Sequence, residues 1–478
     1  MNAQIVRLFG FVLALFVLLL GFTSYWSVFD AGNLKANTAT RRALLLEQRI
    51  HRGDIRTVDG QVIAKSNPLG SGKSRIWIRK YPNGSLFGNP IGYSFTERGR
   101  VGTELAHNDE LIGNRTEFLS ILDELSGNRQ RGDTLVSSLD SRVQRVASDG
   151  LAGQAGAVVA MVPATGQIRA MVSTPEYDPN LIPDDYSTLN SDPTAPLFNR
   201  ATQSGYPPGS TMKVVTATAA LDTGKFKPTT VVDGSSPQTI GGVPLSNSHG
   251  EQFGQIDLTT ALTFSVNTAW AGVGEELGAR TMLDYMRRYG FESKPNIDYP
   301  PFQLTASGVY DGGDLLDSAD AIDVGRVAIG QERLLVTPLQ MAQVAATVAN
   351  HGKRMCPRLW ARVIDVDQRV KRLDPETCAK VMDRRTARQL TEMMKDVVSE
   401  GTGTAAALYG IDVAGKTGTA EVGGRPGCNA PNQAWFIGFA PADDPEIAVA
   451  VTVECTSGYG GDVAAPIAAR VMQEALDG

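Results

Sequence analysis

The segment from Leu8 to Phe29 carries no charged residue over 22 positions. A helical run of this length spans the hydrocarbon core of a bilayer. A single span must be an α-helix, because lipid offers no partners for unpaired backbone groups. The run is too long for the apolar part of a signal peptide, and Tyr25-Trp26-Ser27-Val28-Phe29 resembles an interfacial aromatic belt more than a cleavage site. We therefore expect an uncleaved anchor over 8–29, after a tail of residues 1–7.

The charges that flank this span do not settle its orientation. Arg7 and the amino terminus precede it, whereas Lys35, Arg41, Arg42 and Arg49 follow it. The positive-inside rule compares basic residues close to the two ends of a span, and here it gives no preference. The side on which the rest of the chain folds must therefore follow from its chemistry.

Composition excludes several classes of function. The net charge is −6 without a long basic run, so no nucleic-acid partner is expected. The four histidines are scattered without metal-ligand spacing, and we expect neither a metal nor a cofactor. The chain lacks both the Gly-x-Ser-x-Gly elbow of Ser-His-Asp hydrolases and a phosphate-binding P-loop.

The remaining residues predict an α+β protein with two water-soluble parts. From 52 to 135, short strand-like pieces alternate with Asn-Gly, Asp-Gly and Asn-Pro turns, which indicates a small, mostly β region. A helix capped by Asp140 leads to a boundary near residue 152. Beyond it we expect strands over 156–162, 167–172, 411–421, 434–440 and 447–454, and helices over 210–224, 258–290, 338–350 and 464–476.

Four cysteines lie beyond the anchor, and none of them has Cys-x-x-Cys spacing. Residues 358–373 read as a hairpin around Asp365-Val366-Asp367, which would bring Cys356 near Cys378 and leave Cys428 to pair with Cys455. Four buried free thiols are the alternative. Disulfides require that this part of the chain be exported.

Ser210-x-x-Lys213 places a hydroxyl and an amine on the same face of a helix. A serine is a weak nucleophile until a base takes its proton. Lysine can serve as that base if burial or a second cation lowers its pKa. Alone, the pattern more often marks two solvated residues.

Two further motifs follow in order, Ser265-Val266-Asn267 and Lys416-Thr417-Gly418-Thr419. Ser265 can relay a proton, Asn267 can position Lys213, and the charge of Lys416 can lower the pKa of Lys213. Thr417 and Thr419 suit a substrate carboxylate, and Gly418 leaves room for a peptide beside its strand. The amides of Ser210 and Thr419 could form an oxyanion hole. An ordered set of this kind, with Ser-Asp-Asn in the middle, is typical of penicillin-binding proteins and class A β-lactamases.

With these motifs the chain resembles a class B penicillin-binding protein, of the penicillin-binding protein A type of actinobacteria. Further segments extend the resemblance over roughly residues 50–470: Arg52-Gly-Asp-Ile55 with Asp59-Gly60, Arg79-x-Tyr81-Pro82, Gly99-x-x-Gly102-x-Glu104, Thr134 to Asp140, Asn199-Arg-Ala201, Gly330-Gln331, Thr337-Pro-Leu-Gln340 and Trp435-Phe-Ile-Gly-Phe439. At Arg56-Thr57 the family usually has Asp-Arg, so the ion pair expected there is weakened.

The resemblance implies a peptidoglycan D,D-transpeptidase, acting in septation or elongation, that cross-links stem peptides through a Ser210 acyl-enzyme and is acylated by β-lactams. Residues 30–151 would form the pedestal, or dimerisation-like, domain and residues 152–478 the transpeptidase domain, an antiparallel sheet with helices on both faces and a helical subdomain. The pedestal is too short for a glycosyltransferase, which implies a separate membrane polymerase of the SEDS type. The substrate places the C-terminal domain outside the membrane and the N-terminus in the cytoplasm.

Two other functions remain to be separated from this one. A membrane-bound serine β-lactamase needs a second base to hydrolyse its acyl-enzyme, and no Glu-x-x-Leu-Asn stretch follows Ser210; a β-lactam sensor needs a signalling segment. A non-catalytic cell-wall scaffold would have a decayed site, whereas all motif residues are present here.

Overall fold

The protein is described from a computed structural model. The described residues are 2–24, 44–45, 47–113, 130–316, 319, 322–422, 428 and 430–477. The expected aromatic belt over 25–29 and the basic residues Lys35, Arg41 and Arg42 lie outside them.

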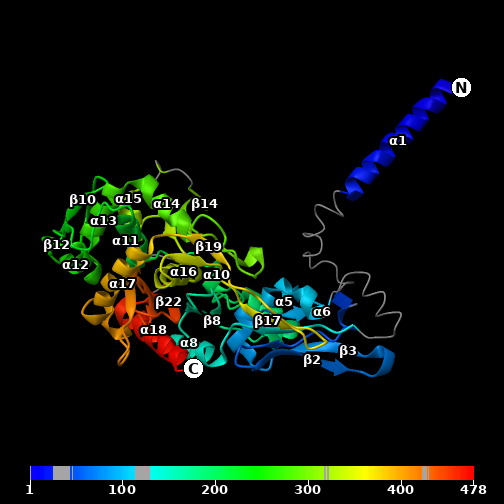
Figure 1. Ribbon diagram of the computed structural model, residues 1–478. Coiled ribbons are helices and arrows are strands. Elements are labelled where there is room, and N and C mark those ends of the chain that lie inside the picture. The colour runs from blue at the N-terminus through cyan, green and yellow to red at the C-terminus, as the bar shows by residue number, and fades with distance from the viewer. Residues whose placement is uncertain are drawn as a thin grey trace.

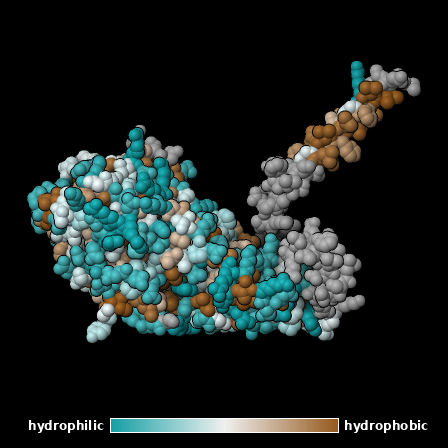
Figure 2. Space-filling model, viewed as in Figure 1, coloured by the Kyte–Doolittle hydropathy of each residue, from teal (hydrophilic) through white to brown (hydrophobic). Residues whose placement is uncertain are grey.

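The N-terminal helix α1 covers Asn2–Ser24, and its segment Gln4–Phe22 is long and apolar enough to cross a membrane. Figure 2 shows it as a hydrophobic rod beside a largely hydrophilic body. The helix begins earlier than the expected residue 8, because the single charge of Arg7 does not interrupt helical backbone. One apolar N-terminal helix is consistent with a single-pass membrane protein.

A six-stranded sheet forms the N-terminal part, in the order β18-β17-β6-β1-β2-β3. Only β1 and β6 run parallel; the other neighbours are antiparallel. Its strands are β1 (Ile55–Arg56), β2 (Val62–Leu69), β3 (Ile76–Lys80), β6 (Thr134–Ser137), β17 (Trp360–Ile364) and β18 (Val370–Arg372). The pair β4 (Ser94–Phe95) and β5 (Gly99–Arg100) and the helices α4 (Gly88–Ile91), α5 (Gly102–Ala106) and α6 (Asn108–Ile112) accompany it.

Two strands of this sheet come from the C-terminal part of the chain. The expected hairpin forms as β17 and β18, and β17 then pairs with β6, with Val363 opposite Leu135. In Figure 1 its yellow ribbon lies among the blue and cyan elements of the N-terminal part. The chain therefore crosses between the two parts more than once, and the domain boundary near residue 152 stays a prediction.

A buried ion cluster joins residues that the family signatures contain. Glu104 is fully buried and accepts from Arg52 Nε at 2.7 Å and from Arg79 Nε at 2.5 Å. Tyr81 Oη also donates to it, at 3.2 Å. Burial alone would raise the pKa of Glu104, but the two arginines outweigh it and lower the pKa to about 2.

The atypical Arg56 lies outside this cluster. It forms an exposed pair with Asp54 at 3.2 Å. The neighbouring Thr57 is buried and accepts a hydrogen bond from the backbone of Gln61. The ion pairing in this part of the chain is therefore centred on Glu104.

The C-terminal part contains a five-stranded antiparallel sheet in the order β20-β21-β22-β7-β8. Its strands are β7 (Gly156–Met161), β8 (Ile168–Thr174), β20 (Ala414–Glu421), β21 (Asn432–Ala440) and β22 (Ile447–Thr456). All five expected strands are confirmed, with shifts at their ends. The expected cap on α8 (Ser141–Leu151) is confirmed as well, because the Asp140 side chain accepts from Arg142 N and Val143 N.

Both faces of this sheet are covered by helices, which makes its strands almost continuously apolar. Alternate residues of β7 point to opposite faces of the sheet. Val159 belongs to the core under α16 (Pro338–Ala349). Val158 belongs to the core under α8 and α18 (Gly460–Leu476). Figure 1 shows the red α18 beside α8. The predicted antiparallel sheet with helices on both faces is confirmed.

A helical region follows the sheet and occupies the green and orange side of Figure 1. Its helices are α11 (Lys213–Asp222), α12 (Leu258–Thr263), α13 (Asn267–Leu277), α14 (Ala279–Tyr289), α15 (Val324–Ala328) and α17 (Arg384–Ser399). Outside this region, α9 (Ile182–Ser191) lies against the N-terminal part, where Arg98 contacts the ring of Tyr186, and α10 (Arg200–Gln203) packs on β7 and β8. Small sheets are formed by β9 (Val231–Asp233) with β12 (Gln255–Asp257), β10 (Gln238–Ile240) with β11 (Val243–Leu245), β16 (Lys353–Met355) with β19 (Thr377–Lys380), and β13 (Gly308–Asp311) with β14 (Asp314–Leu315) and β15 (Leu334–Leu335).

Two disulfides link the cysteines as the hairpin argument predicted. Cys356 bonds Cys378 with their Cα atoms 5.1 Å apart, and Cys428 bonds Cys455 with a Cα separation of 5.3 Å. Both separations are normal for disulfides. The first bond closes the base of the hairpin β17–β18. The alternative of four free thiols is wrong.

Candidate active site

Ser210 lies in a single 3₁₀ turn, η5 (Gly209–Met212), which runs directly into α11. The expected helix start is therefore tighter than an α-helical turn. Gly209 has a φ of +52°, and a Cβ on it would lie 2.8 Å from the carbonyl oxygen of Thr419. Its amide donates to Gly330 O at 3.0 Å. These contacts hold the Ser210 turn against strand β20.

Lys213 is fully buried at the start of α11, and four oxygen atoms surround its amine. Its Nζ lies 3.0 Å from Ser210 Oγ and 3.2 Å from Ser265 Oγ, and 2.7 Å from both Ser265 O and Asn267 Oδ1. Burial, and then the charge of Lys416, lower the pKa of Lys213 well below its ordinary value. A neutral amine donates only two hydrogens, so its lone pair is free to accept the Ser210 proton.

The Ser265–Asn267 segment joins α12 to α13. Ser265 has a φ of +60°, a left-handed conformation that non-glycine residues adopt at a cost of about 1–3 kcal/mol. This turn brings both its hydroxyl and its carbonyl to Lys213. Asn267 opens α13, and its side chain reaches the same amine. The segment thus supplies three of the four oxygen atoms that surround the lysine amine.

Lys416 lies on β20, as expected, and its side chain is fully buried. Burial lowers its pKa to about 7. Its Nζ is 3.2 Å from the carbonyl oxygen of Thr417. The structure thus places two lysines of lowered pKa in one site, and the charge of Lys416 adds to the effect of burial on Lys213.

The three residues after Lys416 contact the nucleophile turn and its neighbours. A Cβ on Gly418 would lie 2.7 Å from Pro208 O, so the turn itself requires glycine here. Thr417 Oγ1 is 2.6 Å from Thr402 Oγ1, and Thr419 Oγ1 accepts from Gly460 N at 3.0 Å. All eight predicted site residues thus surround one region, although their roles remain proposals.

Trp435 contacts the segment before Ser210, and the three motifs alone did not reveal this contact. It lies opposite Gly418 on the neighbouring strand, is fully buried, and donates from Nε1 to Pro207 O at 3.0 Å. Its ring also contacts Tyr206, whose hydroxyl hydrogen-bonds to Glu454. The only signal in the sequence was its place in the signature Trp435 to Phe439.

The Trp435 bond gives a first prediction. Trp435→Phe keeps an aromatic ring but leaves the buried Pro207 carbonyl without its donor, so the Ser210 turn should shift. We expect acylation by penicillin to slow about tenfold, as for the loss of one buried hydrogen bond. Stopped labelling reactions at several penicillin concentrations would measure the rate.

Trp360→Phe is the matched control. Trp360 is fully buried on β17 and, among the described residues, its Nε1 has no hydrogen-bond partner. This change therefore creates a similar cavity without breaking a bond to the site. Equal losses of acylation rate in the two variants would mean that general destabilisation, and not positioning, explains the Trp435 result.

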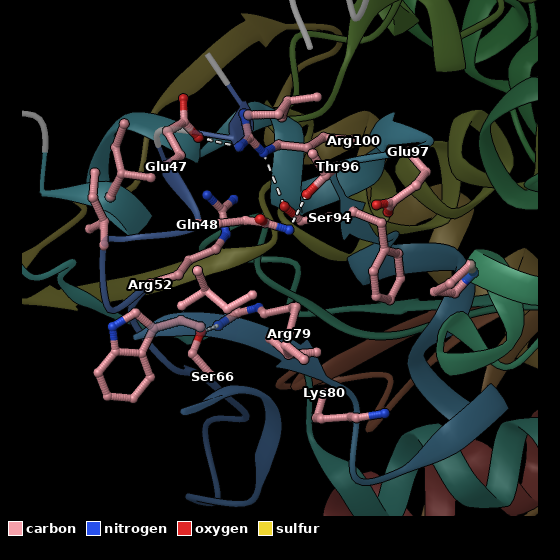
Figure 3. A pocket seen from close by; sticks show the side chains of 18 of the residues that line it. Glu47, Gln48, Arg52, Ser66, Arg79, Lys80, Ser94, Thr96, Glu97 and Arg100 are labelled. Carbon is pink, nitrogen blue, oxygen red and sulfur yellow. Dashed lines mark hydrogen bonds and ion pairs between the residues drawn. The ribbon is translucent and has the colours of Figure 1, made fainter. Parts of the chain in front are cut away.

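A cavity of about 340 Å³ lies in the N-terminal part, away from these residues. Figure 3 shows the polar side chains around it, many of which bind one another: Arg100 pairs with Glu47 and donates to Ser94, and Gln48 donates to Thr96. These bonds tie the segment before β1 to the β4–β5 turn. No group of three His, Cys, Asp or Glu among the described residues could hold a metal ion.

Comparison with known proteins shows which family the chain resembles. Residues 156–473 match the family of the penicillin binding protein transpeptidase domain, and residues 52–135 match the penicillin binding protein A dimerisation domain. The chain is 35% identical to the peptidoglycan D,D-transpeptidase PbpA of Mycolicibacterium smegmatis, over 100% of the chain and 99% of that protein. The PbpA of Mycobacterium tuberculosis is likewise 35% identical, over the full length of both.

Solved structures extend the similarity to the fold. The ceftriaxone acyl-enzyme of penicillin-binding protein A from M. tuberculosis matches with a TM-score of 0.81 and 32% identity, covering 90% of this chain and all of that one. The penicillin G acyl-enzyme of the same protein matches with a TM-score of 0.79 and 32% identity, over 89% of this chain and 100% of the other.

Proposed function

This chain belongs to the class B penicillin-binding proteins, and we propose from this premise that it is a peptidoglycan D,D-transpeptidase in cell-wall synthesis. It would cross-link stem peptides through an acyl-enzyme and would be acylated by β-lactams. The observation that carries the proposal is the fully buried amine of Lys213, 3.0 Å from Ser210 Oγ.

In the acylation step, Ser210 Oγ bonds to the carbonyl carbon of the penultimate D-Ala while its proton passes to Lys213 Nζ. The peptide bond to the terminal D-Ala then breaks. Its leaving nitrogen receives a proton, which Ser265 Oγ can relay from Lys213 because it lies 3.2 Å from the same amine. Asn267 and the carbonyl of Ser265 hold the lysine in place throughout.

In the second step, the amine of a neighbouring stem attacks the acyl carbon. Lys213 takes a proton from that amine, the bond to Ser210 Oγ breaks, and the serine recovers its proton. The lowered pKa of Lys213 favours the neutral amine, which is the form that can accept a proton in each half of the cycle. The product is a new amide bond between two stems.

The strand β20 would bind the donor. Its Lys416 and the hydroxyls of Thr417 and Thr419 suit the terminal carboxylate, and the peptide would lie along the strand beside Gly418. The backbone amides of Ser210 and Thr419 would donate to the oxyanion of the tetrahedral intermediate. The short approach of Gly209 to Thr419 supports this pairing, because it places the two amides on adjacent segments.

The location of the substrate determines the proposed topology. Peptidoglycan lies outside the membrane, so α1 would anchor the chain with its N-terminus in the cytoplasm and the catalytic part outside. The N-terminal sheet would act as the pedestal of this part. A separate membrane glycosyltransferase of the SEDS type would supply the glycan strands.

Labelling with a fluorescent penicillin tests the proposed function. The full-length protein should form one covalent adduct, peptide mass spectrometry should place it on Ser210, and Ser210→Ala should remain unlabelled. The adduct should persist for many minutes. Turnover within seconds would favour a β-lactamase, and an unlabelled wild type would favour a non-catalytic scaffold.

A further inference from the structure

In the proposed function the donor lies between strand β20 and the segment that holds Asn267, a place called the donor groove below. One contact joins the two sides of this place. His249 Nε2 and Tyr459 Oη are 3.1 Å apart, and their rings meet edge to face with centroids 5.5 Å apart. The two residues are 210 positions apart in the sequence. No motif of the catalytic set includes either of them.

His249 belongs to the side of the groove that holds Asn267. It lies in the short turn η6 (Ser248–Gly250), two residues after the buried Asn247. Asn247 Oδ1 accepts from Thr268 N at 3.0 Å and from Thr268 Oγ1 at 3.1 Å. The turn is thereby fixed to the start of α13, directly beside Asn267.

Tyr459 belongs to the side formed by β20. The amide of the next residue, Gly460, donates to Thr419 Oγ1 at 3.0 Å. On its other side, Asn432 Nδ2 donates to Gly458 O at 3.3 Å. The tyrosine therefore projects from a loop that is tied to the strand expected to bind the donor.

Neither side chain is needed for a core. His249 is exposed, and Tyr459 is 47% exposed. The backbone of His249 is nevertheless left-handed, with a φ of +54°, which costs free energy in a residue with a Cβ. Strained conformations of this kind concentrate at functional sites. Core packing therefore does not explain why these two side chains meet.

We propose that His249 and Tyr459 form a gate across the donor groove and set which acyl donors reach Ser210. A compact donor passes with the contact closed, whereas a donor with a bulky side chain must first separate the two rings. This specificity role rests on the proposed transpeptidase function. It adds two residues to the site, one from each wall of the groove.

Acylation rates with two β-lactams of different size test the gate in the full-length protein. Penicillin G serves as the compact donor and ceftriaxone as the bulky one, and the variants are His249→Ala, Tyr459→Phe and the double variant. Tyr459→Phe removes only the hydroxyl and so leaves the loop intact. Tyr409→Phe, on a tyrosine that is fully exposed elsewhere, is the matched control.

The gate predicts that each single variant accelerates acylation by ceftriaxone about three- to tenfold, the range for one hydrogen bond of ordinary net strength. The rate of acylation by penicillin G should change less than about twofold. The double variant should acylate ceftriaxone no faster than the single variants, because all three variants lose the same hydrogen bond. Unchanged or slower ceftriaxone acylation, an equal effect on both drugs, or additive gains would overturn the proposal. These outcomes are distinguishable from a failure of the proposed function, because in that case the wild type would form no adduct on Ser210 with either β-lactam.

Discussion

Lys213→Arg should lower the rate of acylation by penicillin about 10²–10⁴-fold, the contribution of a positioned general base. A guanidinium stays protonated at any pH that the protein tolerates, so it cannot accept the proton of Ser210. In the wild type, burial and then the charge of Lys416 lower the pKa of Lys213, which favours the neutral amine that can accept this proton. The rate constant of labelling by fluorescent penicillin measures this loss of acylation rate. The Ser210→Ala variant gives the background rate of labelling.

Folding and pH provide the controls for this result. Lys213→Met fits the buried space without a charge and should lose acylation as well, while Lys380→Arg, at an exposed lysine, should not. Wild-type acylation should slow as the pH falls and Lys213 becomes protonated. An arginine variant that acylates at the wild-type rate would rule out Lys213 as the base.

Glu104→Ala should destabilise the protein by about 3–5 kcal/mol, because it leaves two buried guanidinium groups without their counter-ion. Glu104 is fully buried, and Arg52 and Arg79 are 7% and 4% exposed. Arg56→Ala is the matched control, since its pair with Asp54 is exposed and should contribute at most about 1 kcal/mol. The free energy of unfolding in urea, followed by a probe in the N-terminal sheet, would measure both.

The same carboxylate predicts a pH dependence with a definite sign. The pKa of Glu104 is lowered to about 2, whereas a glutamate in an unfolded chain titrates near pH 4.3. The stabilisation is therefore complete above about pH 4.3 and is lost as the pH falls towards 2. The difference between wild type and Glu104→Ala should shrink over that window. A constant difference would show that lost packing, and not charge, explains the variant.

The catalytic set was predictable because each motif is short and its residues keep fixed spacing on one local element. Ser210 and Lys213 are one turn apart whatever the rest of the chain does, and Lys416 to Thr419 needs only a strand. The hairpin β17–β18, with the cysteine pair at its base, was predictable from local signals too. The pairing of Cys428 with Cys455 followed only because these two cysteines were left over.

Contacts between distant segments could not be predicted in this way. The bond from Trp435 to Pro207 joins residues 228 positions apart, and the contact of His249 with Tyr459 depends on two loops meeting. The pairing of β17 with β6 also has no sequence signal, because any polar edge strand could accept such a hairpin. Ser210 lies in a 3₁₀ turn whose Gly209 packs closely against Thr419. Helix propensities describe single residues and do not include such a contact.

The position of the Cys356–Cys378 bond has a mechanical consequence. The hairpin β17–β18 leaves the catalytic part, pairs with β6 and returns, and the disulfide joins its two stems where they leave and re-enter. Tension between the N-terminal sheet and the rest of the protein would reach this loop through the pairing of β17 with β6. The covalent bond would carry that load at the loop's base, so the helices beside Ser210 would be shielded from the strain.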